Sequence, residues 1–220
     1  MAFGPVMNMN VGDLKIELAP LTKESVSSFV AGMQQASVTQ YLNASSAFTI
    51  EDEEEWYDKT RKDRNSIIWG IWDVTDGRTL IGNTSLNSFE RDPLFQAVSG
   101  VVITDKEYWG KGIASAIHKA RTWYAFSELG IVRIKSAVIH GNVASKKALQ
   151  KSGYTDVYIE RNTQFSDGQL HHQDNMECLN PLDWAWDRWW GRDVPTPAAL
   201  ASRHVTQDAM EWAESSVTLA

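Results

Sequence analysis

The chain has 220 residues, a net charge of −7, a hydrophobic fraction of 43% and a charged fraction of 22%. This length and composition exclude a disordered chain and allow one large domain with an appendage. The acidic balance argues against broad nucleic-acid binding, and no apolar run approaches the ~20 residues that a membrane helix needs, so we expect neither nucleic acid nor membrane as a partner.

The amino-terminal half alternates apolar and polar residues in short runs separated by turn residues. We interpret the acidic run 52–55 as the first turn of a helix rather than a metal site, because Thr49 and Asp52 have the spacing of a capping box. The expected elements of this half are a strand at 14–18, a helix at 22–32, a helix from Thr49, and strands at 66–74 and 79–87 joined by a hairpin turn at 75–78.

The second half continues this alternation, with glycines marking the ends of its helices. Its expected elements are a strand at 97–104, a helix at 110–128, a strand at 131–139, a helix from Asn142 to Ser152, and strands at 154–161 and 170–179 joined by a hairpin turn at 166–169. This order predicts a mixed α/β layer fold.

A tail of different composition follows Leu179. Four tryptophans crowd its first helix, and Pro197 begins a last helix that reaches about Ser215. Such a large aromatic area predicts that the tail packs on its own domain, and the alternative is that it packs on a second subunit as a homodimer contact.

The charge is unevenly distributed. Residues 111–151 contain eight basic residues and one acidic residue, whereas the rest of the chain contains 13 basic and 27 acidic residues. A bound anion is one explanation for this basic segment, and the solvated faces of two helices are the other.

Tyr108-Trp-Gly-Lys-Gly-Ile-Ala-Ser115 lies between an expected strand and the start of an expected helix. Its glycines let backbone N–H groups approach a bulky anion, and such a turn can hold a pyrophosphate. A Walker loop is excluded because no Gly-x-x-x-x-Gly-Lys-Ser/Thr string is present, and the dinucleotide fingerprint lacks its third glycine at Ser115 and its acidic residue.

A third anion-binding loop fits better. The segment Trp109-Gly-Lys-Gly-Ile-Ala114 resembles the coenzyme A loop of the GNAT N-acetyltransferases at Gly112 and Ala114, and departs from it at Trp109. Asn142-Val-Ala-Ser145 and Leu149-Gln-Lys-Ser-Gly-Tyr154 are similar to elements of the ribosomal-protein (Rim-type) branch of that superfamily. The resemblance covers residues 13–180, which we expect to form the acetyltransferase domain, with residues 181–220 as a helical carboxyl-terminal extension.

The resemblance implies a central mixed, mostly antiparallel sheet flanked by helices, in which strand 97–104 splays from the strand ending at His140. Acetyl-CoA is then the expected co-substrate, with its pantetheine arm beside strand 97–104 and its diphosphate on the loop amides. Lys146 is a further candidate for a phosphate contact. The residues expected to bind acetyl-CoA are Val102, Ile103, Thr104, Trp109, Gly110, Lys111, Gly112, Ile113, Ala114, Ser115, Asn142, Lys147 and Lys151.

Acetyl transfer requires an amine, with a pKa of about 10, to lose a proton, and a thiolate to leave. By the same resemblance Ser145 is the expected acid and Asn142 shapes the site, although both residues can instead simply cap a helix. The base is left open by the sequence. The candidates are Glu90, Asp92, Glu107, His140, Glu160 and Asp174, and His140 has the most suitable pKa range.

No metal is expected, because His171 and His172 are adjacent on a strand and point to opposite faces. The sequence thus predicts an N-acetyltransferase that moves an acetyl group to a primary amine, on a protein amino terminus or a small molecule, by direct attack in a ternary complex. A non-catalytic acyl-CoA-binding module is the alternative. The lone Cys178 and residues 1–7, which have no basic start before an apolar stretch, favour the cytoplasm.

Overall fold

The computed structural model describes residues 3–42, 48–166 and 168–220. The described residues form one nine-stranded sheet in the order β7-β8-β6-β5-β4-β3-β2-β1-β9. The strands are β1 Met7–Val11, β2 Leu14–Ala19, β3 Ile67–Asp73, β4 Thr79–Glu90, β5 Gln96–Ile103, β6 Arg133–Ile139, β7 Thr155–Ser166, β8 Gln169–Leu179 and β9 Val217–Leu219. Every neighbouring pair is antiparallel except β5 and β6, so the expected mixed, mostly antiparallel sheet is confirmed.

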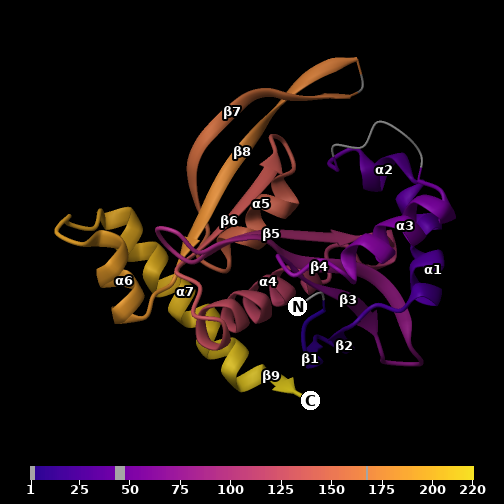
Figure 1. Ribbon diagram of the computed structural model, residues 1–220, viewed down its shortest axis with the longest axis horizontal. Helices are drawn as coiled ribbons and strands as arrows, with labels where there is room; N and C mark the ends of the chain where they lie inside the picture. Colours follow the sequence, from indigo (N-terminus) through magenta and orange to yellow (C-terminus); the bar gives the residue numbers. More distant parts are fainter. Residues whose placement is uncertain (1–2, 43–47, 167) are drawn as a thin grey trace.

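Helices flank this sheet, with α1, α2 and α3 on the side of the molecule opposite α6 (Figure 1). They are α1 Lys23–Met33, α2 Ala36–Thr39, α3 Ile50–Thr60, α4 Ile113–Trp123, α5 Val143–Gln150, α6 Asp183–Trp190 and α7 Pro197–Ser216. A 3₁₀ turn spans Lys106–Tyr108 and a π-helical turn spans Tyr124–Glu128. No helix of the described residues is long and apolar enough to cross a membrane.

The helix caps expected at Thr22 and Thr49 are confirmed. Thr22 and Thr49 both cap their helices with reciprocal side-chain bonds, in the second case to Asp52 over 3.1 Å. The expected helix at 110–128 instead begins at Ile113 and widens into the π-helical turn after Trp123. The widening keeps Tyr124 and Phe126 buried against the sheet.

Three elements were not predicted: β1, α2 and β9. The strand β1 has Asn at two of its five positions and α2 has only four residues, so neither carries a clear local pattern. The hairpin between β3 and β4 is confirmed. The hairpin between β7 and β8 is also present, and residue 167 in its turn lies outside the described residues.

The tail packs on its own chain. Helix α7 lies against α4, and β9 adds an edge strand beside β1 (Figure 1). Ser202 of α7 donates a hydrogen bond to the Gly153 carbonyl over 2.6 Å. The division of the chain after residue 180 and the homodimer both stay predictions.

The feature that positions the site is the incomplete pairing of β5 with β6. The two strands are parallel and are paired only from Gln96 to Val98, opposite Arg133 to Lys135. Beyond Val98 they separate, as expected. The part of β5 from Ser99 to Ile103 therefore has one edge without a neighbouring strand.

Candidate active site

The glycine loop runs from the end of β5 to the start of α4. Gly110 and Gly112 have φ angles of 76° and 85°, in the left-handed region that glycine enters without a steric penalty. A Cβ atom at Gly110 would meet no atom within 4 Å, so the space beside the loop is open. These two glycines place the loop backbone, rather than side chains, against that space.

The first turn of α4 offers unused donors. Gly112 caps the helix without a side-chain bond, and the first helical hydrogen bond is from Ala116 N–H to the Gly112 carbonyl over 3.1 Å. Within the described residues, the N–H groups of Ile113, Ala114 and Ser115 therefore have no helical acceptor. Three such donors at the positive end of a helix favour a bound anion.

Two side chains anchor the loop. The Tyr108 hydroxyl donates to Asp73 over 2.8 Å, and the Trp109 indole donates to the Ile103 carbonyl over 3.0 Å. Burial, followed by the Asp73 carboxylate, raises the pKa of Tyr108 to about 12, so its phenol keeps its proton and the bond to Asp73.

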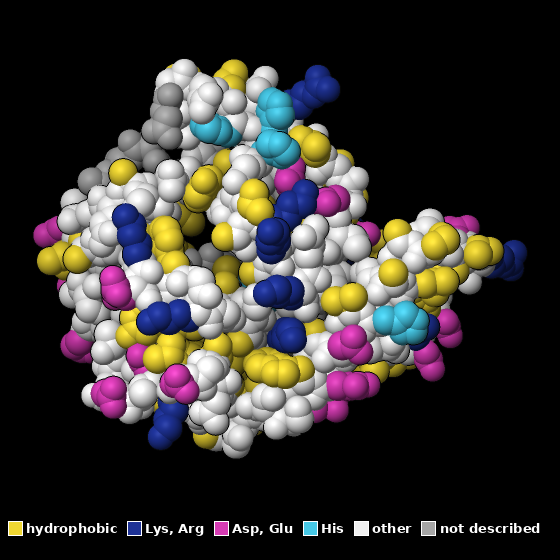
Figure 2. All heavy atoms as spheres, turned by 180° about the vertical axis from the view of Figure 1, so that it is seen from behind, with side chains coloured by type: hydrophobic (Ala, Val, Ile, Leu, Met, Phe, Trp, Pro, Cys, Tyr) yellow, Lys and Arg dark blue, Asp and Glu magenta, His cyan; other side chains and the backbone are white. Residues whose placement is uncertain are grey.

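A cleft of about 890 Å³ fills the gap between β5 and β6. Its walls are the free edge of β5, the glycine loop, residues 136–139 of β6 and the first turns of α5. Figure 2 shows a hollow on this face with Lys and Arg side chains beside it, and the basic residues that line the cleft are Lys147 and Lys151.

The structure brings most of the expected acetyl-CoA residues to this one cleft. Those that line it are Val102, Ile103, Trp109, Gly110, Gly112, Ile113, Ala114, Ser115, Asn142, Lys147 and Lys151. Thr104 and Lys111 do not: Thr104 is buried and donates to the Ile81 carbonyl, and the Lys111 ammonium lies 5.5 Å from the centre of the Tyr108 ring.

The start of α5 brings the expected acid into the cleft. The Asn142 side chain accepts a hydrogen bond from Ser145 N–H over 3.2 Å, and both residues line the cleft. Asn142 therefore caps the helix and fixes the direction of its first turn. Within the described residues, the Ser145 hydroxyl makes no side-chain hydrogen bond, so it is free to bond a ligand.

His140 lies outside the cleft. Its Nδ1 is 2.9 Å from the buried carboxylate of Asp174, which also accepts from Lys146 over 2.9 Å. Burial by itself raises the pKa of Asp174, but the hydrogen bonds from His140 and Lys146 outweigh it and hold the pKa below its usual value. Lys146 also pairs with Asp156 over 2.7 Å, so its ammonium is directed away from a phosphate role.

A buried pair beneath the cleft was missed by sequence reasoning. Arg121, one of the eight basic residues of the charged segment, is fully buried and donates to the Gly100 carbonyl and the Thr84 hydroxyl, each over 2.7 Å. Its other terminal nitrogen is 2.7 Å from Nδ1 of His118, which lines the cleft. Burial, followed by the Arg121 charge, lowers the pKa of His118 well below its usual value, so this ring is neutral and holds the arginine against β5.

A second, smaller cavity adjoins the cleft. It has a volume of about 250 Å³ and shares Asn83, Ser85 and Val102 with the cleft, so the two meet in β4 and near the end of β5. Its only acidic lining residue among those described is Glu53, which the sequence placed in an ordinary capped first turn. None of the six expected base candidates lines either cavity.

Comparison with known proteins connects this geometry to a family. Residues 15–155 match the model of the acetyltransferase (GNAT) domain. The chain is 31% identical over 146 residues to a probable N-acetyltransferase, YjcK, of Bacillus subtilis, with 64% of this chain and 79% of that protein covered.

Solved structures share the fold. Spermidine N-acetyltransferase from Vibrio cholerae, in complex with CoA and spermine, superposes with a TM-score of 0.68 at 19% identity, over 75% of this chain and 95% of that one. A GNAT-family acetyltransferase from Bacillus anthracis superposes with a TM-score of 0.65 at 16% identity, over 80% of this chain and 99% of that one. With the family model spanning most of the sheet, the splayed strands and the glycine loop, the chain belongs to the GNAT family of acetyltransferases.

Proposed function

We propose that this acetyltransferase moves the acetyl group of acetyl-CoA to a primary amine by direct attack in a ternary complex. One observation carries the proposal: the three unused N–H donors of α4 and the free edge of β5 face the same cleft. The N–H donors can bind a diphosphate, and the free strand edge can pair with an arm that contains amide groups. The assignment to the ribosomal-protein branch rests on the Tyr108–Gly112 and Asn142–Ser145 elements and belongs to this proposal.

Each end of the cleft has a role in binding. In this proposal the amides of 110–115 hold the diphosphate, and Lys147 and Lys151, which line the cleft, contact phosphate oxygens. The free edge of β5 pairs with the pantetheine arm. The thioester then lies near Val102, whose amide polarises its carbonyl oxygen. We assign the protonation of the leaving thiolate to the Ser145 hydroxyl, which Asn142 positions by capping α5.

The single cysteine supports direct transfer. Cys178 is fully buried and does not line the cleft. Its sulfur forms hydrogen bonds with the Ser152 carbonyl and the Thr206 hydroxyl. Burial raises the pKa of its thiol to about 12, so the reactive thiolate is not populated near neutral pH. An acetyl-enzyme on this residue would need the core to open.

The test combines calorimetry with acetyl-CoA and a thiol-release assay across a panel of primary amines. We expect acetyl-CoA to bind and at least one amine to release thiol. Binding without thiol release for every amine would favour the non-catalytic module, and no binding at all would overturn the proposal.

A further inference from the structure

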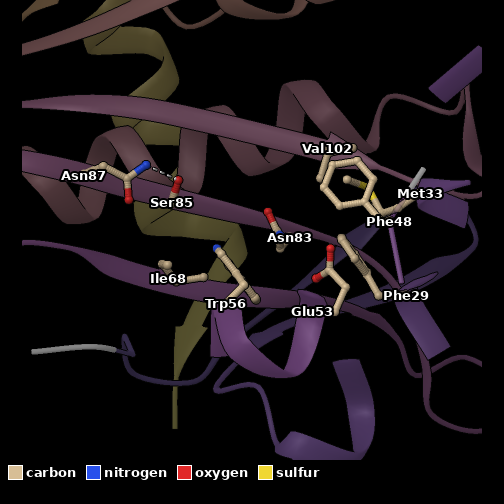
Figure 3. A pocket seen from close by; sticks show the side chains of 10 residues that line it. All are labelled: Phe29, Met33, Phe48, Glu53, Trp56, Ile68, Asn83, Ser85, Asn87 and Val102. Carbon is tan, nitrogen blue, oxygen red and sulfur yellow. Dashed lines mark hydrogen bonds between the residues drawn. The ribbon is translucent and has the colours of Figure 1, made fainter. Parts of the chain in front are cut away.

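The small cavity beside the cleft is built for chemistry that acetyl-CoA does not explain. It lies between the sheet and helices α1 and α3, and its contact with the cleft at Val102 is where the thioester is proposed to lie. Its lining residues are Phe29, Met33, Phe48, Glu53, Trp56, Ile68, Asn83, Ser85, Asn87 and Val102 (Figure 3). A molecule in this cavity would therefore lie next to the position proposed for the thioester.

Glu53 is the unusual member of this set. It is only 5% exposed, and Figure 3 shows its carboxylate pointing from α3 into the space bounded by Trp56 and Asn83. The ion pairs of the described residues of α3 involve its neighbours instead, with Glu54 3.1 Å from Lys23 and Glu55 2.8 Å from Lys59. Among the described residues the Glu53 carboxylate has no hydrogen-bond or ion-pair partner, so a bound cation would supply the partner that this largely buried group lacks.

The electrostatics agree with this geometry. Burial, and then the charge of Asp52, raises the pKa of Glu53 above its usual value. A higher pKa makes the carboxylate a stronger base and brings it closer to the pKa of an amine. Within the described lining of this cavity no Lys, Arg or His competes for it.

The other lining residues indicate what kind of molecule the cavity can hold. Phe29, Phe48 and Trp56 supply aromatic surface, and Met33 and Ile68 add aliphatic surface, while Asn83, Ser85 and Asn87 add polar groups from β4. The volume of about 250 Å³ exceeds the ~150 Å³ cavity that is known to hold benzene. One aromatic ring with a short aminoalkyl arm fits this space, whereas a long chain with several charges would place charges against apolar walls.

We propose that this cavity binds the acceptor as a small primary monoamine with an apolar body, and that the Glu53 carboxylate holds its ammonium group and takes its proton. This inference rests on the proposed function, because it places the acceptor beside the thioester. It assigns the role of base, which the sequence left open among six other residues, to a residue of α3. The role of His140 as base stays a prediction of the sequence alone.

The ammonium gives one proton to Glu53, and the free amine nitrogen forms a bond to the thioester carbonyl carbon. The carbon–sulfur bond breaks as the Ser145 hydroxyl gives its proton to the leaving sulfur and recovers one from the nitrogen. Glu53 returns its proton to solvent after the amide leaves. In total, one ammonium and one thioester give one amide, one thiol and one proton.

The test uses the full-length protein, with Glu53→Gln as the variant and Glu55→Gln as the matched control on the same helix. The amines are 2-phenylethylamine, phenylalanine, spermidine and a tripeptide that begins with phenylalanine. We expect the first to be the best acceptor, and we expect Glu53→Gln to lower its kcat/KM by about 100-fold or more. Glu55→Gln should match the parent protein, because that side chain faces solvent.

Further measurements distinguish a loss of amine binding from misfolding and from a failure of the proposed function. Calorimetry with acetyl-CoA should give the same affinity for both variants, and thermal unfolding of Glu53→Gln should occur at an equal or higher temperature, because an unpaired buried charge has been removed. Direct binding of 2-phenylethylamine should be present in the parent protein and lost in Glu53→Gln. This result would support the cavity as an amine-binding site even if no thiol were released and the proposed function failed.

Other outcomes overturn the inference. Unchanged turnover and unchanged amine binding in Glu53→Gln would exclude Glu53 from both roles. A preference for spermidine, phenylalanine or the tripeptide over 2-phenylethylamine would show that the cavity does not select an apolar monoamine.

Discussion

Replacing Gly153 by alanine should destabilise the protein where helix α7 packs against the turn after α5. Gly153 follows α5, has a φ of 86°, and accepts a hydrogen bond from Ser202 of α7. A Cβ atom at this position would overlap the Thr206 hydroxyl and lie 3.0 Å from the Ser202 carbonyl oxygen. The close contact therefore joins the helix that carries Ser145 to the helix of the tail.

The structure sets the size of the effect. A left-handed φ costs an alanine about 1 to 2 kcal/mol. Overpacking against α7 adds about 1 to 3 kcal/mol. The expected loss in the free energy of unfolding is then about 2 to 5 kcal/mol. Gly130→Ala is the matched control, because Gly130 has a φ of 66° and a Cβ atom there would meet nothing within 4 Å, so only the backbone cost of about 1 to 2 kcal/mol applies.

Urea unfolding of the parent protein and four variants measures these terms, the variants being Gly153→Ala, Gly130→Ala, Thr206→Ala and the double variant Gly153→Ala/Thr206→Ala. We expect Gly153→Ala to cost about 1 kcal/mol less in the Thr206→Ala background, because the overlapped hydroxyl is gone. If Gly153→Ala costs no more than Gly130→Ala, and its cost is the same with and without Thr206→Ala, then α7 does not pack against this turn.

Three other changes test the cleft and its surroundings. Ser145→Ala should lower kcat about 100-fold while leaving acetyl-CoA affinity unchanged, and full turnover in a steady-state thiol assay would remove the acid role. Lys147→Gln should weaken acetyl-CoA binding about fivefold at low salt, whereas Lys111→Gln should not, because Lys147 lines the cleft and Lys111 does not; equal effects in calorimetry would contradict this placement. Asp174→Asn should cost about 1 to 3 kcal/mol at pH 7. Because the pKa of Asp174 is lowered in the folded state, its stabilisation exists above the unfolded-state pKa of about 3.9 and is lost as pH falls through the folded value, so the difference in Tm between parent and variant should shrink below about pH 4. A difference in Tm that stayed constant down to pH 3 would show that the interactions of Asp174 with His140 and Lys146 do not depend on its charge.

Local chemistry determined much of this protein. The caps at Thr22, Thr49 and Asn142 and the turn at the glycine loop depend on residues a few positions apart, and each was found where the sequence placed it. Most of the strands were also expected, since alternation and hairpin turns are local patterns. The fold class therefore followed from the sequence.

Tertiary contacts decided the remaining features. Glu53 belongs to a run of acids that look alike in the sequence, and only the packing of α3 against the sheet buries this one beside Val102. From the sequence, the charge of Arg121 is expected to be available to a ligand. In the folded protein this side chain is buried and donates a hydrogen bond to β5. The pairing of β9 with β1 joins segments some two hundred residues apart. Periodicity and capping report on neighbours in the chain, whereas burial, charge pairing and strand order depend on which distant segments meet, and that is known only once the chain has folded.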